Sequence, residues 1–247
     1  MALFEARNLH KRFGDQVVLE EINLSFEAGT LAGIMGPNGA GKTTCFNVLT
    51  GRYKPDRGNV TFDGRDITGQ SPEKIVQGGI ARSFQIMNLF DEYSAIDNIK
   101  VALPDTRRRR FDILHAFDGT SEAEARAESV LASVGLAGKE HSPAASLSYG
   151  ERRALEIGVA LAADPAILFL DEPTSGLGTE ATGRLADLVR SLRDRYTIVV
   201  IEHDMRFLFG LADRISVIHW GQVIAEGTPE ELQANKWVQR SALGSLN

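Results

Sequence analysis

Apolar residues recur in two different patterns along this chain. Residues 3–10 and 17–26 alternate apolar and polar side chains, which is typical of half-buried antiparallel strands, and Phe13-Gly14-Asp15 is suited to the turn between them. Continuous apolar runs separated by helical segments are instead typical of a parallel sheet with both faces covered. Three such runs lie at residues 166–170, 197–201 and 215–218. The pattern therefore predicts an α/β protein that contains both kinds of sheet.

Helical spacing dominates the middle of the chain, from residue 94 to residue 136, where Ser121 and Glu124 predict a capping box. We expect a single domain over residues 1–247. In it, a helical subdomain of about 94–163 is inserted into a core and β subdomain formed by about 1–93 and 164–247. The other expected elements are a strand at 59–62 with an Asp63-Gly64 turn, a buried strand at 79–84, a last strand at 221–227, and a helix that begins at Thr228 with Pro229 at its first position.

The strongest chemical signal is a glycine-rich loop at residues 36–44, which follows an apolar run at 31–35 and leads into helical spacing up to Leu49. Strand, loop and helix in this order are the context that a phosphate-binding loop requires. Glycines let successive backbone N–H groups point at phosphate oxygens, and the helix N-terminus adds positive potential. Lys42 is expected on the β and γ phosphates and Thr43 on Mg²⁺. The expected nucleotide contacts are Gly36, Pro37, Asn38, Gly39, Ala40, Gly41, Lys42, Thr43 and Thr44.

Two carboxylates, Asp171 and Glu172, end the apolar run at 166–170. The carboxyl ends of parallel strands form the edge at which ligands bind, so Asp171 is predicted to hold Mg²⁺ and Glu172 to polarise an attacking water. Taken alone, the pair could equally be the acidic first turn of the next helix. His203 follows the apolar run at 197–201 and is expected at the same edge as a further catalytic group.

Composition excludes several classes of protein. A net charge of −6 gives no overall basic surface, which argues against a dedicated nucleic-acid binder. No apolar run approaches the roughly 18 to 20 residues that span a bilayer, and residues 1–10 do not resemble a signal peptide. The lone Cys45 excludes an intrachain disulfide and is expected to be a small core residue in a reducing compartment.

Leu147-Ser148-Tyr149-Gly150-Glu151 precedes a helix expected at residues 152–163, and with this segment the chain resembles the ATP-binding subunits of ABC transporters. Five features stand in the order and spacing of that family over almost the whole chain. They are the phosphate loop, Gln85 after a strand, the signature at 147–151, Asp171-Glu172, and His203. Tyr149 and Glu151 depart from the commoner Gly and Gln, as familiar variants.

The resemblance implies a P-loop ATPase in which two subunits sandwich two ATP molecules. Each nucleotide would lie between the phosphate loop of one subunit and Ser148 and Gly150 of the other, since a helix N-terminus there offers donors to a γ-phosphate. Phe13 would stack on adenine. Gln85 would join Thr43 and Asp171 around Mg²⁺ and sense the membrane subunit.

The resemblance bears on one apolar segment with two interpretations and on one departure from the family. The apolar residues after Gln85, from Ile86 to Phe90, either pack internally or line a groove for a partner helix. We favour the groove because of the resemblance. Gly178 stands where many family members have Asp, so a carboxylate that would help to couple the two nucleotide sites is absent.

Residues 81–85, 88–90, 201–205 and 237–244 are similar to the ATPases of branched-chain amino acid importers, a group that includes urea and short-chain amide importers. The similarity implies permease subunits in the membrane, a second identical or paralogous ATPase subunit, and indirect contact with a periplasmic solute-binding protein. The chain would lie peripherally at the cytoplasmic face of the inner membrane, without nucleic acid. The alternatives are an ATPase of lipid or lipopolysaccharide export and a soluble ABC ATPase. Arg107 to Arg110 form either a solvated loop or a contact with anionic headgroups.

Overall fold

The computed structural model describes residues 2–83, 89–104, 121–236 and 238 of this chain of 247 residues. In that part, an antiparallel sheet has the strand order β2-β1-β4-β5. Its bounds are β1 Ala2–Phe13, β2 Gln16–Glu27, β4 Arg57–Phe62 and β5 Arg65–Asp66. The predicted hairpin is confirmed, because β1 and β2 pair from Ala2 with Glu27 to Phe13 with Gln16 around the Gly14-Asp15 turn.

The second sheet has the order β10-β9-β3-β8-β7-β6. Its strands are β3 Leu31–Met35, β6 Ile80–Arg82, β7 Ile167–Asp171, β8 Thr197–Glu202, β9 Arg214–His219 and β10 Gln222–Gly227. Pairing is parallel from β9 through β3, β8 and β7 to β6, and β10 joins β9 antiparallel at one edge. The mainly parallel sheet predicted from the continuous apolar runs is confirmed. The strand predicted at 79–84 is shorter, and residue 84 lies outside the described part.

Both faces of the parallel sheet are buried, which explains why its strands read as continuous apolar runs. Ile167 and Phe169 of β7 face an aromatic core shared with the antiparallel sheet, while Leu168 and Leu170 face a core built from helices. Helix α1, Lys42–Leu49, lies between the two sheets and packs Phe46 edge-on against Phe169, with 6.2 Å between ring centroids. The start of α1 is thereby set against the end of β3.

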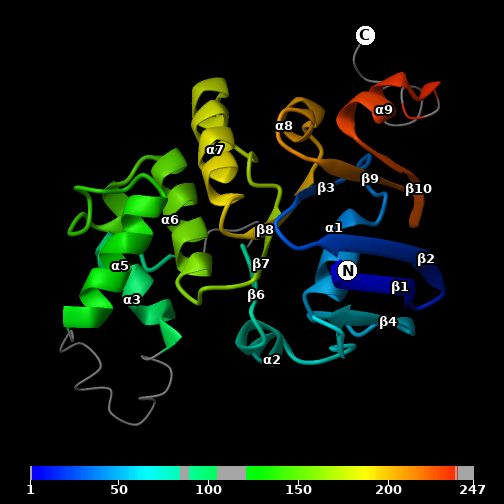
Figure 1. The fold of residues 1–247 in the computed structure, drawn as a ribbon, viewed down its shortest axis with the longest axis horizontal. Coiled ribbons are helices and arrows are strands. Elements are labelled where there is room, and N and C mark those ends of the chain that lie inside the picture. The colour runs from blue at the N-terminus through cyan, green and yellow to red at the C-terminus, as the bar shows by residue number, and fades with distance from the viewer. Residues whose placement is uncertain (1, 84–88, 105–120, 237, 239–247) are drawn as a thin grey trace.

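Three helices stand together at the left of Figure 1: α3 Ala95–Ala102, α5 Ser121–Ser133 and α6 Tyr149–Leu161. The helical character predicted from 94 to 136 is found in α3 and α5, with α3 ending at Ala102. The predicted capping box rests on the side chain of Ser121, which lies outside the described residues. The subdomain boundaries at 94 and 163 also remain a prediction.

The helix predicted at 152–163 begins three positions earlier, at Tyr149, and ends at Leu161. Ser148 caps it: its Oγ accepts from the Glu151 N–H, and Glu151 Oε2 accepts from the Ser148 N–H. This reciprocal cap draws most of the signature segment into the first helical turn. The other helices with bounds in the described residues are α2 Pro72–Gln77, α7 Thr179–Leu192, α8 Met205–Phe209 and α9 Pro229–Ala234, with a 3₁₀ turn at Ala144–Ser146.

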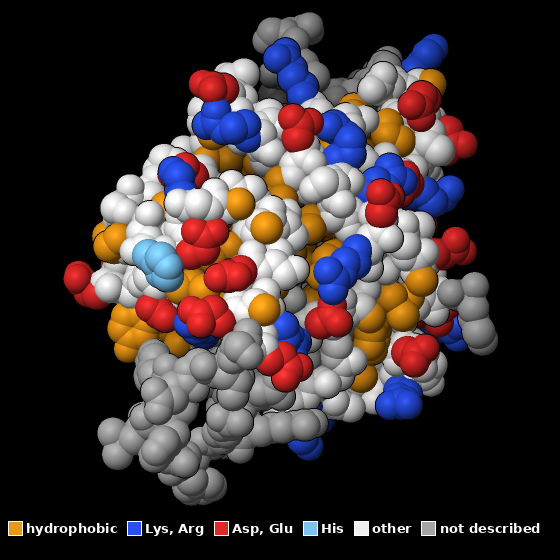
Figure 2. Space-filling view, turned by 60° about the vertical axis from the view of Figure 1, so that its left-hand side comes forward, with side chains coloured by type: hydrophobic (Ala, Val, Ile, Leu, Met, Phe, Trp, Pro, Cys, Tyr) orange, Lys and Arg blue, Asp and Glu red, His pale blue; other side chains and the backbone are white. Residues whose placement is uncertain are grey.

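The face shown in Figure 2 carries Lys and Arg side chains interspersed with Asp and Glu side chains, and hydrophobic side chains reach the surface between them. Within the described residues, every helix is too short or too polar to cross a bilayer.

Candidate nucleotide site

The glycine-rich loop connects β3 to α1 as its flanking sequence predicts. Two of its glycines are required by geometry. A Cβ on Gly36 would stand 2.1 Å from the carbonyl oxygen of Ile218 on β9, and Gly41, at the N-cap of α1, has φ of 101°. The loop is therefore pressed against the neighbouring strand and turned so that α1 starts at its end. Asn38, Gly39 and Thr43 face solvent along this turn.

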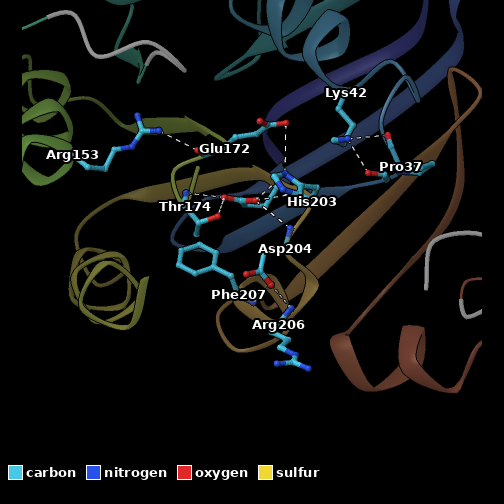
Figure 3. A network of polar contacts seen from close by, with 11 residues as sticks. Pro37, Lys42, Arg153, Glu172, Thr174, His203, Asp204, Arg206 and Phe207 are labelled. Carbon is cyan, nitrogen blue, oxygen red and sulfur yellow. Dashed lines mark hydrogen bonds and ion pairs between the residues drawn. The ribbon is translucent and has the colours of Figure 1, made fainter. Parts of the chain in front are cut away.

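The Lys42 side chain is folded into the loop and almost entirely buried. Its Nζ donates to the carbonyl oxygen of Gly36 at 2.8 Å and to that of Pro37 at 2.9 Å (Figure 3). Burial lowers the pKa of this ammonium group, and the negative charges of Glu172, Glu202 and Asp171 oppose that effect. Since an ammonium has three donors, Lys42 can hold the loop and still donate to a phosphate.

Asp171 ends β7 and is 4% exposed. Burial raises the pKa of its carboxyl to about 6, and the charge of Glu172 adds to the rise, while the Arg82 and Arg153 guanidinium groups work against it. Its backbone N–H donates to Ser83 Oγ at 3.4 Å, which ties the end of β7 to the segment after β6. A buried carboxyl that is costly to ionise is a site at which a cation is favourable.

Glu172 and His203 come from the ends of adjacent parallel strands, β7 and β8, and lie side by side as predicted. His203 Nδ1 is 3.8 Å from Glu172 Oε1. Figure 3 shows the Glu172 carboxylate directed toward the His203 ring, with Lys42 on the far side of the same space. The backbone of Glu172 is left-handed, with φ of 44°, a conformation that is strained for a residue with a Cβ. The predicted catalytic side chains Lys42, Glu172 and His203 thus share one edge of the sheet.

Glu202 is a residue of this site that the sequence patterns did not single out. It is 0% exposed at the end of β8. Its Oε1 accepts from the N–H of Thr174 at 2.8 Å and from the Thr174 hydroxyl, and its Oε2 accepts from the N–H of His203 at 2.9 Å. One buried carboxylate therefore fastens the loop after Glu172 to the loop that carries His203. An ionisable residue directly after the apolar run at 197–201, still within the buried strand, was the available signal.

Arg153 of α6 is a second such residue, with only 1% of its side chain exposed. It forms an ion pair with Glu156 at 2.5 Å and donates to the backbone carbonyl oxygens of Pro173 and Glu172 at 3.1 Å each. The pattern that indicates it is an Arg and a Glu three positions apart on the apolar side of a helix. The pair connects the signature helix to the segment that carries Glu172.

Ser148 and Gly150 lie at the N-terminus of α6, apart from Lys42, and line a groove between α5, α6 and α7 with a cavity volume of about 520 Å³. Lys139 binds the carboxylate of Glu151 and, together with the Ser148 N–H, lowers the pKa of that carboxyl to about 2. The signature residues are thus held by their own helix cap, and they do not complete the phosphate loop of the same chain.

Phe13 lies at the tip of the β1–β2 hairpin with 44% of its surface exposed. Its ring packs edge-on against Tyr53 at 5.3 Å between centroids, and Lys11 Nζ lies 5.5 Å from the ring centroid. Nearly half of the surface of Phe13 stays exposed to solvent. Gln85, Met87 and Arg107 to Arg110 lie outside the described residues, so their predicted roles stay predictions.

Known proteins share this architecture from end to end. A family model described as ABC transporter matches residues 19–175. The chain is 38% identical over 251 residues to the high-affinity branched-chain amino acid transport ATP-binding proteins LivG of Salmonella typhimurium and BraF of Pseudomonas aeruginosa, with 98% of this chain and 98% of each relative covered.

Solved structures agree. The ADP conformation of MJ1267, an ATP-binding cassette of an ABC transporter, superposes with a TM-score of 0.88 at 28% identity, covering 99% of this chain and 100% of that one. A dimeric post-hydrolysis state of the cassette MJ0796, bound to ADP and Pi, gives a TM-score of 0.73 at 25% identity, covering 92% and 98%. With the family model spanning most of the chain and relatives matching it over nearly their whole length, this chain belongs to the ABC transporter family.

Proposed function

We propose that this chain is the ATP-hydrolysing subunit of an importer for branched-chain amino acids or related small polar solutes. The observation that carries the proposal is the convergence of Lys42, Asp171, Glu172 and His203 at one sheet edge. Nearly full-length similarity to LivG and BraF supports this importer group over the alternatives of lipid export and a soluble ATPase.

Lys42 and the backbone N–H groups of residues 36–44, except Pro37, which has none, hold the ATP phosphates in this proposal. The Thr43 hydroxyl and the Asp171 carboxylate are hard oxygen donors, which suits Mg²⁺. The carboxylates of Asp171, Glu172 and Glu202 all act on the Lys42 charge, so the site carries more negative than positive side chains and fits a bound cation. When bound, Mg²⁺ neutralises charge on the β and γ phosphates.

Glu172 orients the attacking water, and His203 donates to the γ-phosphate. The strained backbone of Glu172 supports this assignment, because strain at one residue is retained where surrounding contacts impose a functional geometry. Phosphoryl transfer needs little beyond an aligned nucleophile and neutralised charge, and these two side chains supply the alignment.

A second ATPase subunit, identical or paralogous, completes each site with its Ser148 and Gly150. The separation of the signature from the phosphate loop within one chain supports this, as does the dimeric form of MJ0796. Phe13 stacks on adenine through its exposed surface.

Permease subunits bind at the apolar surface after Gln85, and a periplasmic solute-binding protein acts through them. Phe90 is 53% exposed and stacks on Tyr93 at 5.2 Å, while Leu89 is half-buried against the helical core. An exposed aromatic pair beside a half-buried leucine is suited to a helix of a partner. The chain then lies peripherally at the cytoplasmic face of the membrane.

The test is Glu172→Gln, which preserves shape and removes the carboxylate that orients water. We expect turnover to fall by at least about 100-fold while ATP binding persists, and ATP with Mg²⁺ to trap a dimer on gel filtration. Glu128→Gln on the exposed side of α5 is the matched control and should behave like the wild type. Near wild-type turnover in Glu172→Gln would remove Glu172 from its role.

A further inference from the structure

Side chains on one face of helix α6 contact the segment 172–176. Tyr149 and Arg153 are four positions apart and Glu156 follows three positions later, so the three share a side of the helix. Arg153 reaches the carbonyl oxygens of Glu172 and Pro173, and the Tyr149 hydroxyl donates to the carbonyl oxygen of Ser175 at 3.3 Å. Contacts from one helix thus reach almost the full length of the segment.

The position of Arg153 requires that its positive charge be buried, which is unfavourable unless the charge is paired. Its guanidinium is 1% exposed, and Glu156, itself 5% exposed, neutralises it at 2.5 Å. A buried ion pair adds little net stability compared with apolar side chains of similar size, so its presence here is better explained by the geometry it imposes. That geometry points the Nε donor at the carbonyl oxygen of Pro173 and the Nη2 donor at that of Glu172. Figure 3 shows the contact with Glu172.

The backbone of Glu172 is held from several directions against its own strain. Its N–H donates to the Ile201 carbonyl oxygen at 2.8 Å, and its carbonyl oxygen accepts from Arg153 and from the Ser175 N–H, both at 3.1 Å. A left-handed φ of 44° persists only where such contacts overdetermine it. Removal of the Arg153 contact therefore takes away one of the three backbone contacts that hold the residue whose carboxylate must be aligned.

Tyr149 closes the other end of the segment. A Cβ on Gly176 would lie 3.0 Å from the Tyr149 hydroxyl oxygen, so the ring covers this glycine directly. Tyr149 stands where many family members have Gly, and Gly178, just beyond the segment, stands where many have Asp. In this chain, the signature helix contacts the segment through an aromatic ring that a glycine cannot provide.

We propose that Arg153, assisted by Tyr149, is a positioning residue that couples the two nucleotide sites of the dimer. The inference rests on the proposed function: the N-terminus of α6 meets the γ-phosphate held by the partner subunit, while the next turn of the same helix sets Glu172 at the site of its own subunit. Engagement of Ser148 by one nucleotide then places the carboxylate that acts on the other.

Arg153→Met tests the positioning role. We expect kcat to fall by about 10- to 100-fold with KM for ATP unchanged, since misplacement of a catalytic group by about 1 Å has an effect of this size. Arg153→Lys, which keeps the charge, should recover part of the loss. Arg152→Met is the matched control, because the neighbouring arginine points instead to Asp91 and to the Ala144 carbonyl oxygen, and it should retain wild-type kcat.

Two further measurements separate positioning from a structural defect. In the Glu172→Gln background, Arg153→Met should leave ATP-trapped dimerisation intact, and failure to dimerise would show that Arg153 only builds the signature helix. Turnover of Arg153→Met within twofold of the wild type would also overturn the proposal. If the Met variant does not fold, Arg153→Lys and Tyr149→Phe carry the same comparison, and wild-type kcat in both would contradict it.

Coupling between the sites is tested by a double-mutant cycle of Ser148→Ala with Arg153→Lys on kcat. The product of the single losses should exceed the loss in the double variant by about threefold or more, and Ser148→Ala with Arg152→Met should be multiplicative. Multiplicative effects in both cycles would overturn the coupling. Active Glu172→Gln would sink the proposed function itself, whereas inactive Glu172→Gln with unaffected Arg153 variants would sink only this inference.

Discussion

At the scale of single residues, the buried carboxylate of Asp171 lowers the stability of the folded protein when it is ionised. Asp171 is buried beside Glu172, and its pKa is about 6 in the folded chain against 3.8 for an ordinary aspartate. Below pH 3.8 the carboxyl is neutral in both the folded and the unfolded state and costs nothing. Between pH 3.8 and about 6 the unfolded state ionises this group while the folded state still holds the proton, so the cost grows across this window and is complete above pH 6. The folded state is then disfavoured by an amount on the order of 3 kcal/mol.

Asp171→Asn should therefore raise the melting temperature of the nucleotide-free, Mg²⁺-free protein at pH 8, with the difference shrinking toward pH 4. Thermal melting across this range measures it. Asp194→Asn, at an exposed position, serves as the control and should change the melting temperature little at any pH. A variant at Asp171 that is no more stable than the wild type at pH 8 would contradict the assigned cost of ionisation.

At the scale of elements, two helices begin with the same cap but differ in what lies in front of them. Ser148 with Glu151 caps α6, and Thr228 with Glu231 caps α9. Loss of such a hydroxyl costs about 0.5 to 2 kcal/mol. Only the α6 cap is proposed to face a nucleotide. Comparing variants of the two caps therefore distinguishes the effect of losing a helix cap from the effect of losing a nucleotide contact.

Ser148→Ala and Thr228→Ala should lower the free energy of unfolding by similar amounts, measured by urea denaturation. ATP turnover should fall only in Ser148→Ala, because only that hydroxyl is proposed to meet a phosphate. Equal turnover in the two variants, at equal stability, would argue that Ser148 acts as a helix cap alone.

The surface after Gln85 gives a second prediction at this scale. Phe90 is mostly exposed and Leu89 packs against the core, so Phe90→Ser should leave the melting temperature nearly unchanged and abolish pull-down with permease subunits. Leu89→Ser should lower the melting temperature, because it removes core packing, at a cost of up to about 2 to 5 kcal/mol. A large destabilisation by Phe90→Ser with pull-down retained would place that ring in the core.

At the scale of the whole molecule, the signature and the phosphate loop of one chain do not form a single site. Turnover of the isolated subunit should consequently rise faster than linearly with protein concentration across the dimerisation range. Specific activity measured together with sedimentation velocity tests this. Constant specific activity in a sample shown to be monomeric would contradict the shared site.

Local patterns determined much of this protein by themselves. The phosphate loop, the carboxylates at the end of β7 and His203 after β8 could be predicted because parallel strands end at a common edge, so their sequence positions imply their proximity. The start of α6 was misplaced although the sequence carries its signal, because Ser148 and Glu151 have the spacing of a capping box and that pattern was not used to place the helix.

Tertiary structure alone decided the rest. Arg153 donates to carbonyl oxygens 19 and 20 positions further along the chain. Glu202, at the end of β8, accepts a hydrogen bond from Thr174, which lies 28 positions earlier. Backbone carbonyls carry no side-chain signature, so no spacing of residue types indicates such contacts. Whether a charged side chain in a helix faces solvent or a buried loop depends on what packs against that helix, and this is set only when the sheet and the helices have assembled.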